Sequence, residues 1–534
     1  MIQFLAWYLA VSLLGLLTFP LAFRLFPALA DRGYSLARAL GLLLWGYIFW
    51  LLASLGIVQN DIGGLLLALL ILTGLSGWAL WKTIVNWLKS NLRLIFITEA
   101  LFLLSFAFLA LVRAANPEIV GTEKPMELAF INAILRSPAF PPHDPWLSGY
   151  AISYYYFGYV LTAMLAKLTA TPGPLAFNLM LSLVFALSAI GAYGILYNLI
   201  SIYRYHQSRS TLHPPLLTSF LGPLFLLLVS NLEGFLEVLH RRGIFWPSNP
   251  QPATRNFWQW LDIKDLTHPP SQPLAWIPER FWWWWRASRV VQDYDLAGNW
   301  REIIDEFPFF SYLLGDLHPH VLAMPFGLLA IAVALNLFLG GFRGETSLFG
   351  MRVIRVPVNR TGFFFSAVVL GGLAFLNTWD FPIYLALVCG ALACTRSLSV
   401  LARARDEGWR LQRLEEFLAF ALPLGILALM LYLPFYFGFS SQAGGVLPNL
   451  VSPTRGAHLW VMFGSLLLPV FTYLAYLGWG EKRSINWKVG IGLALGLVFF
   501  LWGFGWILAW FANLRSPEMA ASFLQSNGMT DVAT

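Results

Sequence analysis

"LRLIFITEALFLLSFAFLALV", residues 92–112, carries only one basic and one acidic side chain among apolar ones. A helix needs about 20 predominantly apolar residues to cross the hydrocarbon core of a bilayer, and this stretch supplies them. "FLAWYLAVSLLGLLTF" from Phe4 and "LGLLLWGYIFWLLASLGI" from Leu40 repeat the pattern. The sequence therefore predicts a membrane protein built from spanning helices.

The composition agrees with this interpretation. Hydrophobic residues make up 58% of the chain and charged residues 11%, and the mean hydropathy is +0.66. A soluble chain of 534 residues could not bury so much apolar surface. The basic residues behind the net charge of +7 lie mostly in short loops, where they set the orientation of spans. We therefore expect membrane lipid, and no nucleic acid, as a partner.

Three further features narrow the class of protein. Cys389 and Cys394 lie in one apolar run, which excludes a disulfide framework and a cysteine-based metal site. The run from Phe4 has no basic segment before it and no small-residue cleavage site, so we expect a span and not a removed signal peptide. The sequence contains no Walker loop, which argues against an ATP-driven pump.

The expected fold class is all-α, a polytopic transmembrane helical bundle of about 12 spans. The apolar runs lie at about 4–25, 37–57, 62–82, 94–112, 174–200, 216–239, 321–340, 361–378, 380–395, 415–437, 459–479 and 489–511. With the N-terminus outside, every basic cluster falls on the cytoplasmic side. Large outer loops then cover about 113–173 and 240–320. The prediction is a multi-pass protein of the cell (plasma) membrane with an extracytoplasmic active face.

Residues 153–169, which contain Tyr154, Tyr155 and Tyr156, do not fit this topology as a crossing. A full crossing would reverse the side of every later loop. We therefore predict a re-entrant or juxtamembrane segment, which is permitted at membrane depth when its backbone is buried against protein or lines a wet cavity. The three tyrosines would form the wall and rim of an outward, substrate-binding cavity. The competing interpretation is a full crossing.

The first outer loop contains the predicted catalytic carboxylates. "PMELAFINAILRS" predicts a short interfacial helix that begins at Pro125, because proline suits the first helical position. Glu127 lies in its first turn, where it can satisfy free N–H groups and the helix dipole. Glu123 precedes the helix and points at water, so it is the better candidate for a general base or metal ligand. The alternative for Glu123 is a solvated loop carboxylate.

"GDLHPH" supplies Asp316, His318 and His320 at alternate positions. Pro319 favours an extended backbone before it, and alternate residues of an extended segment share one face. Carboxylate and imidazole together favour Zn, Mn or Fe over Ca. The predicted cofactor is therefore a divalent metal ion (Mn, Mg or Zn), and the alternative is a hydrogen-bonded cluster without metal.

Other candidate residues lie near the expected ends of spans. Glu233 and Asp380 are acidic residues near membrane depth, where a charge is costly and usually marks a functional site or a structural pair. "FWWWWRASRV" offers Trp284 as a stacking surface for a sugar ring, with Arg286 and Arg289 as phosphate ligands. The alternative for this run is an aromatic belt with an arginine anchor.

Four motifs in this order, "SYYYFGY", "FWWWWRASRV", "EFPFFSYLLGDLHPH" and "LNTWDFP", resemble the YYY family of uncharacterised membrane proteins, named for its tyrosine triplet. The resemblance covers most of the chain from about residue 90. It divides the chain into N-terminal transmembrane helices at 1–90 and a YYY-like transmembrane domain at 91–534. Because family members are often longer, we expect that the polar end "RSPEMAASFLQSNGMTDVAT" marks a truncated form.

The first outer loop also resembles that of the GT-C glycosyltransferases, polytopic enzymes that transfer sugars from polyprenyl-phosphate carriers. Glu123 and Glu127, "AFPPHDPWLSGY" and "ISYYYFGYVLTAMLAKL" follow the order of an acidic motif, a proline- or aromatic-rich segment and a span. The acidic pair is not the adjacent Asp-Glu usual in that family. The resemblance implies a polyprenyl-phosphate-linked sugar donor, an unknown acceptor, and a carboxylate, preferably Glu123, that deprotonates the acceptor hydroxyl.

Two other functions remain open from the sequence. A transporter or flippase for a lipid or polar solute would explain carboxylates near membrane depth, although no internal repeat is recognisable. A non-catalytic membrane assembly protein is the third interpretation.

Overall fold

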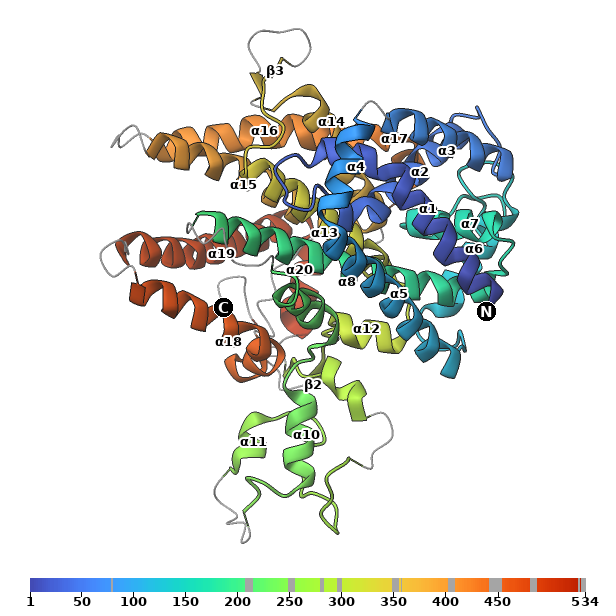
Figure 1. Cartoon of the computed structure of the whole chain (residues 1–534). Helices are drawn as coiled ribbons and strands as arrows, with labels where there is room; N and C mark the ends of the chain where they lie inside the picture. Colours follow the sequence, from blue (N-terminus) through green and yellow to red (C-terminus); the bar gives the residue numbers. More distant parts are fainter. Residues whose placement is uncertain are drawn as a thin grey trace. The chain divides into compact units, whose positions relative to one another are not determined.

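The computed structural model describes residues 1–77, 80–206, 215–247, 255–278, 283–294, 300–347, 355–356, 358–401, 409–440, 454–480, 487–526 and 529. It is mostly helical, as the apolar runs predict (Figure 1). Two short antiparallel strand pairs accompany the helices. They are β1 (Gln292–Tyr294) with β2 (Trp300–Glu302), and β3 (Thr346–Ser347) with β4 (Arg355–Val356).

The chain forms two compact units. Unit 1 comprises Met1–Leu228 and Ser311–Gln442, and unit 2 comprises Val229–Phe310 and Ala443–Thr534. Both units therefore combine segments that are far apart in the sequence. The division at residue 90 rests on a family resemblance and not on the compactness of the fold. It stays a prediction.

Unit 1 contains most of the long helices. In chain order they are α1 (Ile2–Leu25), η1 (Tyr34–Leu36), α2 (Ala37–Ser54), α3 (Ile62–Ser76), α4 (Trp81–Ser90), α5 (Leu92–Ala115), α6 (Lys124–Arg136), α7 (Phe157–Leu168), α8 (Gly173–His206), η2 (Thr218–Phe220), α9 (Leu221–Pro223), η3 (Leu224–Leu228), α13 (Pro319–Phe338), α14 (Arg360–Leu376), α15 (Asp380–Leu401), α16 (Trp409–Leu431) and α17 (Leu433–Gly438). Helix α12 (Pro308–Leu314) includes the point at which the chain passes between the units.

Unit 2 contains shorter elements and the C-terminal helices. They are α10 (Glu233–Arg241), α11 (Phe257–Leu261), η4 (Trp283–Ser288), the β1–β2 pair, α18 (Gly456–Gly480), α19 (Trp487–Arg515) and α20 (Pro517–Ser526). The side chain of Asn256 caps α11 by accepting the backbone N–H of Gln259 at 2.9 Å. The Gln259 side chain accepts the backbone N–H of Asn256, so both hydrogen bonds of this capping box are present.

Eight helices in the described ranges are long and apolar enough to cross a membrane, or up to ten if two bent pairs are each one span. The chain is therefore a multi-pass membrane protein. Each of the 12 predicted runs contains a helix, but Arg360–Leu376 and Asp380–Thr395 are among the shorter apolar ones. The number 12 stays a prediction.

Helix α7 holds the segment that the sequence sets apart from the spans. It has 12 residues, so it is about 18 Å long, well short of a bilayer core of about 30 Å. Lys167 near its end donates to the backbone carbonyl of Asn60, in the connection between α2 and α3. Its residues Phe157–Ala166 are buried against the protein, which satisfies the condition for a non-crossing segment at membrane depth.

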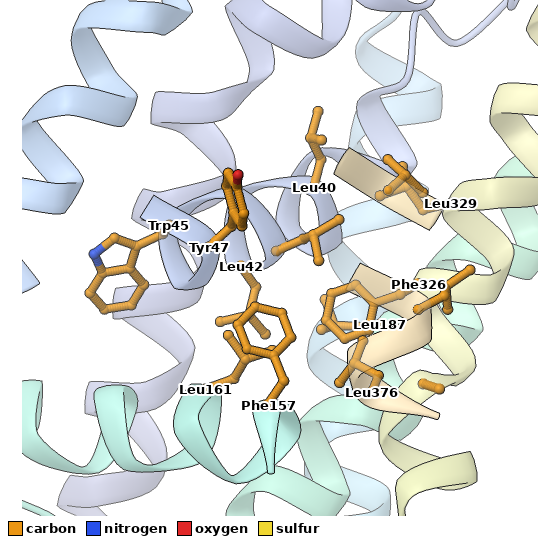
Figure 2. Packing of buried hydrophobic residues seen from close by; sticks show 14 of the residues in the cluster. Leu40, Leu42, Trp45, Tyr47, Phe157, Leu161, Leu187, Phe326, Leu329 and Leu376 are labelled. Atoms are coloured by element: carbon orange, nitrogen blue, oxygen red, sulfur yellow. The ribbon is translucent and has the colours of Figure 1, made fainter. Parts of the chain in front are cut away.

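The core of unit 1 joins α2, α7, α8, α13 and α14 (Figure 2). Leu40 and Trp45 of α2 belong to the same cluster as Phe157 and Leu161 of α7. The ring of Phe157 stacks on Phe375 of α14 with centroids 4.9 Å apart. Packing of this kind fixes α7 to the bundle from several sides.

Local signals in the sequence explain where several helices begin. Asp61 precedes α3 and accepts the N–H of Gly64 at 2.8 Å. Asn359 precedes α14 and accepts the N–H of Gly362, also at 2.8 Å. Such side chains satisfy backbone groups that the first turn of a helix leaves without a partner.

Candidate functional site

A group of polar side chains in unit 1 lies where the start of α6, the segment before α7 and the turn from α12 to α13 meet. We call it the α6–α13 cluster. Its members are Glu123, Lys124, Glu127, Tyr154, Asp316, His318 and His320. Six of the seven were candidates from the sequence alone, which places the predicted acidic loop and the "GDLHPH" motif in one site.

The beginning of α6 directs its two carboxylates differently. Pro125 occupies the first turn, as predicted, and Glu123 precedes the helix without capping it. Glu127 is fully buried, and its Oε2 accepts the backbone N–H of Leu317 at 2.9 Å. The donor therefore comes from the α12–α13 turn and not from α6 itself. A carboxylate in the first turn of a helix can accept N–H groups of its own helix or of another segment. The packing of α6 against the α12–α13 turn gives Glu127 a partner of the second kind.

Glu123, His318 and Tyr154 form a triangle of polar atoms. The Glu123 Oε2 lies 3.1 Å from His318 Nε2 and 3.4 Å from the Tyr154 hydroxyl, which donates to it. The Tyr154 oxygen is 3.3 Å from the same His318 nitrogen. The Glu123 side chain is 52% exposed and that of His318 is 32% exposed. Since all these contacts use Oε2, the second oxygen of Glu123 can accept a proton from another molecule.

The two histidines continue the chain of contacts. His318 Nδ1 lies 2.8 Å from His320 Nδ1, and the charges of His320 and Asp380 interact. When Glu123 is ionised, the His318 N–H at Nε2 donates to it, so Nδ1 is left to accept the N–H of His320. The result is a row of proton-carrying groups from Glu123 to His320.

Asp316 interacts with Thr122 and Lys124 as well as with His318. Its pKa is raised, chiefly by burial, and a hydrogen bond from Thr122 and the charge of Lys124 oppose the increase. Among the described residues, no group of three or more His, Cys, Asp and Glu side chains is arranged to hold a metal ion. The alternate spacing of the motif does not by itself make three ligands converge. A metal at Asp316, His318 and His320 stays a prediction.

Asp316 and Glu127 form a buried carboxyl pair. Burial raises the pKa of Glu127 well above its ordinary value, and the nearby Asp316 raises it further. Glu127 Oε1 and Asp316 Oδ1 have no other hydrogen-bond partner within the described part of the chain. The raised pKa favours the protonated form of Glu127, and two carboxyl groups can hydrogen-bond to each other only when one of them is protonated.

Two cations near the pair were not among the sequence candidates. Lys124 is only 8% exposed; burial lowers its pKa, whereas the charge of Asp316 raises it. Arg113, at the end of α5, donates from Nε to Asn178 Oδ1 at 2.8 Å. Its guanidinium packs against Gly315, whose φ of +77° and missing Cβ permit that approach. The signal in the sequence for Arg113 is its position as a basic residue at the end of an apolar run, just before the acidic loop.

The tyrosine triplet divides between the site and the core. Tyr154 reaches the cluster, and burial, followed by the charge of Glu123, raises its pKa. Tyr155 packs on Phe439 with ring centroids 5.3 Å apart. Tyr156 is 3% exposed, and its hydroxyl accepts the indole N–H of Trp50 at 3.4 Å. One of the three hydroxyls therefore faces the cluster, and the other two rings fasten the segment to unit 1.

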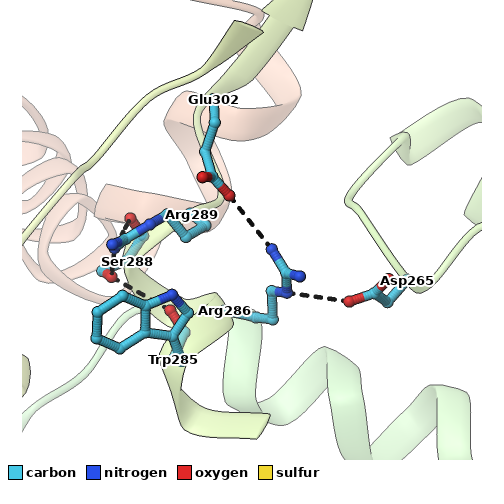
Figure 3. A network of polar contacts seen from close by, with 6 residues as sticks. All are labelled: Asp265, Trp285, Arg286, Ser288, Arg289 and Glu302. Atoms are coloured by element: carbon cyan, nitrogen blue, oxygen red, sulfur yellow. Dashed lines mark hydrogen bonds and ion pairs between the residues drawn. The ribbon is translucent and has the colours of Figure 1, made fainter. Parts of the chain in front are cut away.

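The remaining candidates lie in unit 2 and have partners within it (Figure 3). Arg286 Nε lies 3.0 Å from Asp265 Oδ2, and its Nη1 lies 3.5 Å from Glu302 Oε1. Arg289 lies over the Trp285 ring, 4.2 Å from its centroid, and donates to Ser288. These contacts hold both guanidinium groups in place.

Trp284 and Glu233 also belong to unit 2. Trp284 packs on Phe310 with ring centroids 5.7 Å apart. Glu233 is fully buried at the start of α10, and its backbone N–H donates to Asn231 Oδ1 at 3.1 Å. Binding of substrate by the four candidates of unit 2 stays a prediction, as does binding by Asp380 of unit 1.

One protein family, described as "Uncharacterized membrane protein (DUF2298)", matches residues 44–525. No curated protein and no solved structure matches the chain.

Proposed function

The chain belongs to this family of uncharacterized membrane proteins (DUF2298), and on that premise we propose that it is an integral membrane glycosyltransferase of the GT-C type. It transfers a sugar from a polyprenyl-phosphate-linked donor to an acceptor at the outer face of the plasma membrane. The observation that carries the proposal is the contact of Glu123 with His318 and Tyr154 at the ends of helices in a multi-pass protein.

In the proposed reaction Glu123 is the general base. Its free oxygen accepts the proton of the acceptor hydroxyl, and the acceptor oxygen forms a bond to the anomeric carbon of the sugar. The bond between that carbon and the phosphate oxygen breaks, and polyprenyl phosphate leaves with the electron pair. His318 holds the carboxylate through Nε2, and the Glu123 side chain is 52% exposed, so the proton leaves it to water.

The buried groups have a positioning role in this proposal. Glu127 holds the Leu317 N–H, which fixes the turn that carries His318. Lys124 lies beside Asp316 and Glu127 and adds positive charge near the site, which favours a leaving phosphate. Tyr154 contacts the base through its hydroxyl. A divalent cation is a separate proposal, and no step above depends on it.

The test uses the full chain in detergent with undecaprenyl-phosphate-linked glucose, mannose and arabinose as donors. We expect release of undecaprenyl phosphate from one of them, measured by mass spectrometry. The Glu123→Gln variant should lose roughly 10²–10⁴-fold in rate, the usual contribution of a general base. Glu118→Gln is the matched control, because Glu118 is an exposed carboxylate of the same loop, and it should keep the wild-type rate.

Two results would contradict the proposal. Equal turnover in the Glu123→Gln variant and the wild type would remove Glu123 from the chemistry. Uptake of a lipid or solute into sealed vesicles, without release of polyprenyl phosphate, would favour a transporter.

A further inference from the structure

A cavity of unit 1 lies along the face of α6 that points away from Glu127 and has a volume of about 460 Å³. Ala129, Asn132, Ala133 and Arg136 line it from the helix, at the spacing of three and four residues that defines one helical face. Its opposite wall is the loop 137–145. The volume falls in the range of about 300–1,000 Å³ that small-molecule sites occupy.

Three side chains of this cavity have hydrogen-bond donors that the protein does not use. Within the described residues, the guanidinium of Arg136, the amide of Asn132 and the imidazole of His143 make no hydrogen bond or ion pair. Ser137 accepts the backbone N–H of His143 at 3.1 Å, so its own hydroxyl proton is left to donate. A ligand with several acceptor oxygens would satisfy these groups together.

Asp144 favours a hydrogen-bond donor on the ligand, whereas the side chains above favour acceptors. Its Oδ1 accepts the backbone N–H groups of Trp146 and Leu147, each at 2.8 Å, which fixes the carboxylate at the cavity. Its Oδ2 has no partner in the described chain and can accept from a ligand hydroxyl. A simple anion would meet repulsion from this carboxylate, whereas a ligand that also carries hydroxyl groups would not.

We propose that this cavity binds a phosphorylated sugar or polyol, with its phosphate on Arg136, Asn132 and His143 and its hydroxyls on Asp144. Arginine suits the phosphate because its planar fork donates two parallel hydrogen bonds to it. The site lies on another face of α6 from Glu127, so it does not depend on the transfer reaction proposed above. The ligand is either a free sugar phosphate or the headgroup of a lipid that contains a phosphate and a polyol.

The test measures binding to the full chain with four probes: glucose 1-phosphate, glucose, inorganic phosphate, and phosphatidylinositol in nanodiscs. We expect glucose 1-phosphate or phosphatidylinositol to bind more tightly than glucose or phosphate. Preference for one of the first two identifies the free or the lipid source. Arg136→Gln should weaken binding by on the order of tenfold or more, because it removes a charge-assisted contact.

Two further variants make the result specific. Arg360→Gln changes another exposed arginine of unit 1 and should leave binding unchanged. Ala129→Trp fills the cavity without removing a polar group and should abolish binding, with folding checked by thermal unfolding. The proposal is overturned if no probe binds, or if Arg136→Gln and Ala129→Trp bind as the wild type does.

Discussion

Glu127 is a fully buried carboxyl, and burial together with the nearby Asp316 raises its pKa, which favours the protonated form. Glutamine has the same shape, donates through its amide N–H and accepts through its oxygen, so Glu127→Gln should keep the fold. Glu127→Ala leaves the Leu317 N–H and the Asp316 carboxylate without this partner. We expect Ala to cost about 1–3 kcal/mol for each group left unsatisfied. Thermal unfolding of the purified variants measures the difference.

The pH dependence follows from the same proton. The folded pKa of Glu127 lies above its ordinary value of 4.5, so the folded chain holds more protons than the unfolded one above that pH. The stabilisation is complete below pH 4.5 and is lost as pH rises through the folded pKa. Glu127→Gln should lessen this decline in Tm. An equal loss of stability in the Gln and Ala variants would show that Glu127 is ionised.

A second prediction on the pH dependence of stability concerns Asp305 of unit 2. Burial raises its pKa from 3.8 to about 7, and the N–H of Val291 and the charge of Arg289 oppose the increase. Stability should therefore fall as pH rises from about 4 to about 7. Asp305→Asn should reduce that slope in Tm, and Asp61→Asn, which keeps a helix cap, should not. An unchanged slope in Asp305→Asn would contradict the assignment.

Helix contacts depend on small residues where two backbones approach. A Cβ on Gly371 of α14 would collide with the backbone carbonyl oxygen of Ala428 on α16, and backbone cannot rotate away as a side chain can. We expect Gly371→Ala to destabilise the protein by about 1–3 kcal/mol. Gly390→Ala is the matched control, because a Cβ there meets nothing within 4 Å. Equal Tm values for the two variants would show that α14 and α16 can separate without loss.

At the scale of the whole molecule, the topology of the chain can be tested with a membrane-impermeant maleimide. In a Cys394→Ala background, which removes an exposed thiol, Tyr150→Cys and Ala170→Cys place labels on the two sides of α7. We expect both to react from outside intact cells, because α7 is too short to cross. Ser90→Cys, predicted to be cytoplasmic, should react only after permeabilisation. Labelling of Tyr150→Cys and Ala170→Cys from opposite sides would show that α7 crosses.

Much of the fold could be predicted because the signals are local. The helix that begins at Leu92 and the helix that begins near Pro125 are each determined by neighbouring residues in the sequence. Hydrophobicity favours the first as a span, and proline favours the start of the second. The number of spans was less certain, since Arg360–Leu376 is short and buried. The sequence does not point to Lys124, because a lysine in a loop is usually solvated and only tertiary packing buries this one.

A multi-pass helical membrane protein follows from the hydrophobic pattern of the sequence alone, which also points to Glu123, Glu127 and the motif from Asp316 to His320. The tertiary structure decided which of these groups meet. Glu127 and Leu317 are 190 positions apart, and no local pattern reports which carboxylate takes a partner at that separation. Packing of α6 against the α12–α13 turn buries Glu127 and leaves Glu123 at the surface beside His318. Burial separates the two carboxylates, and burial belongs to the whole fold.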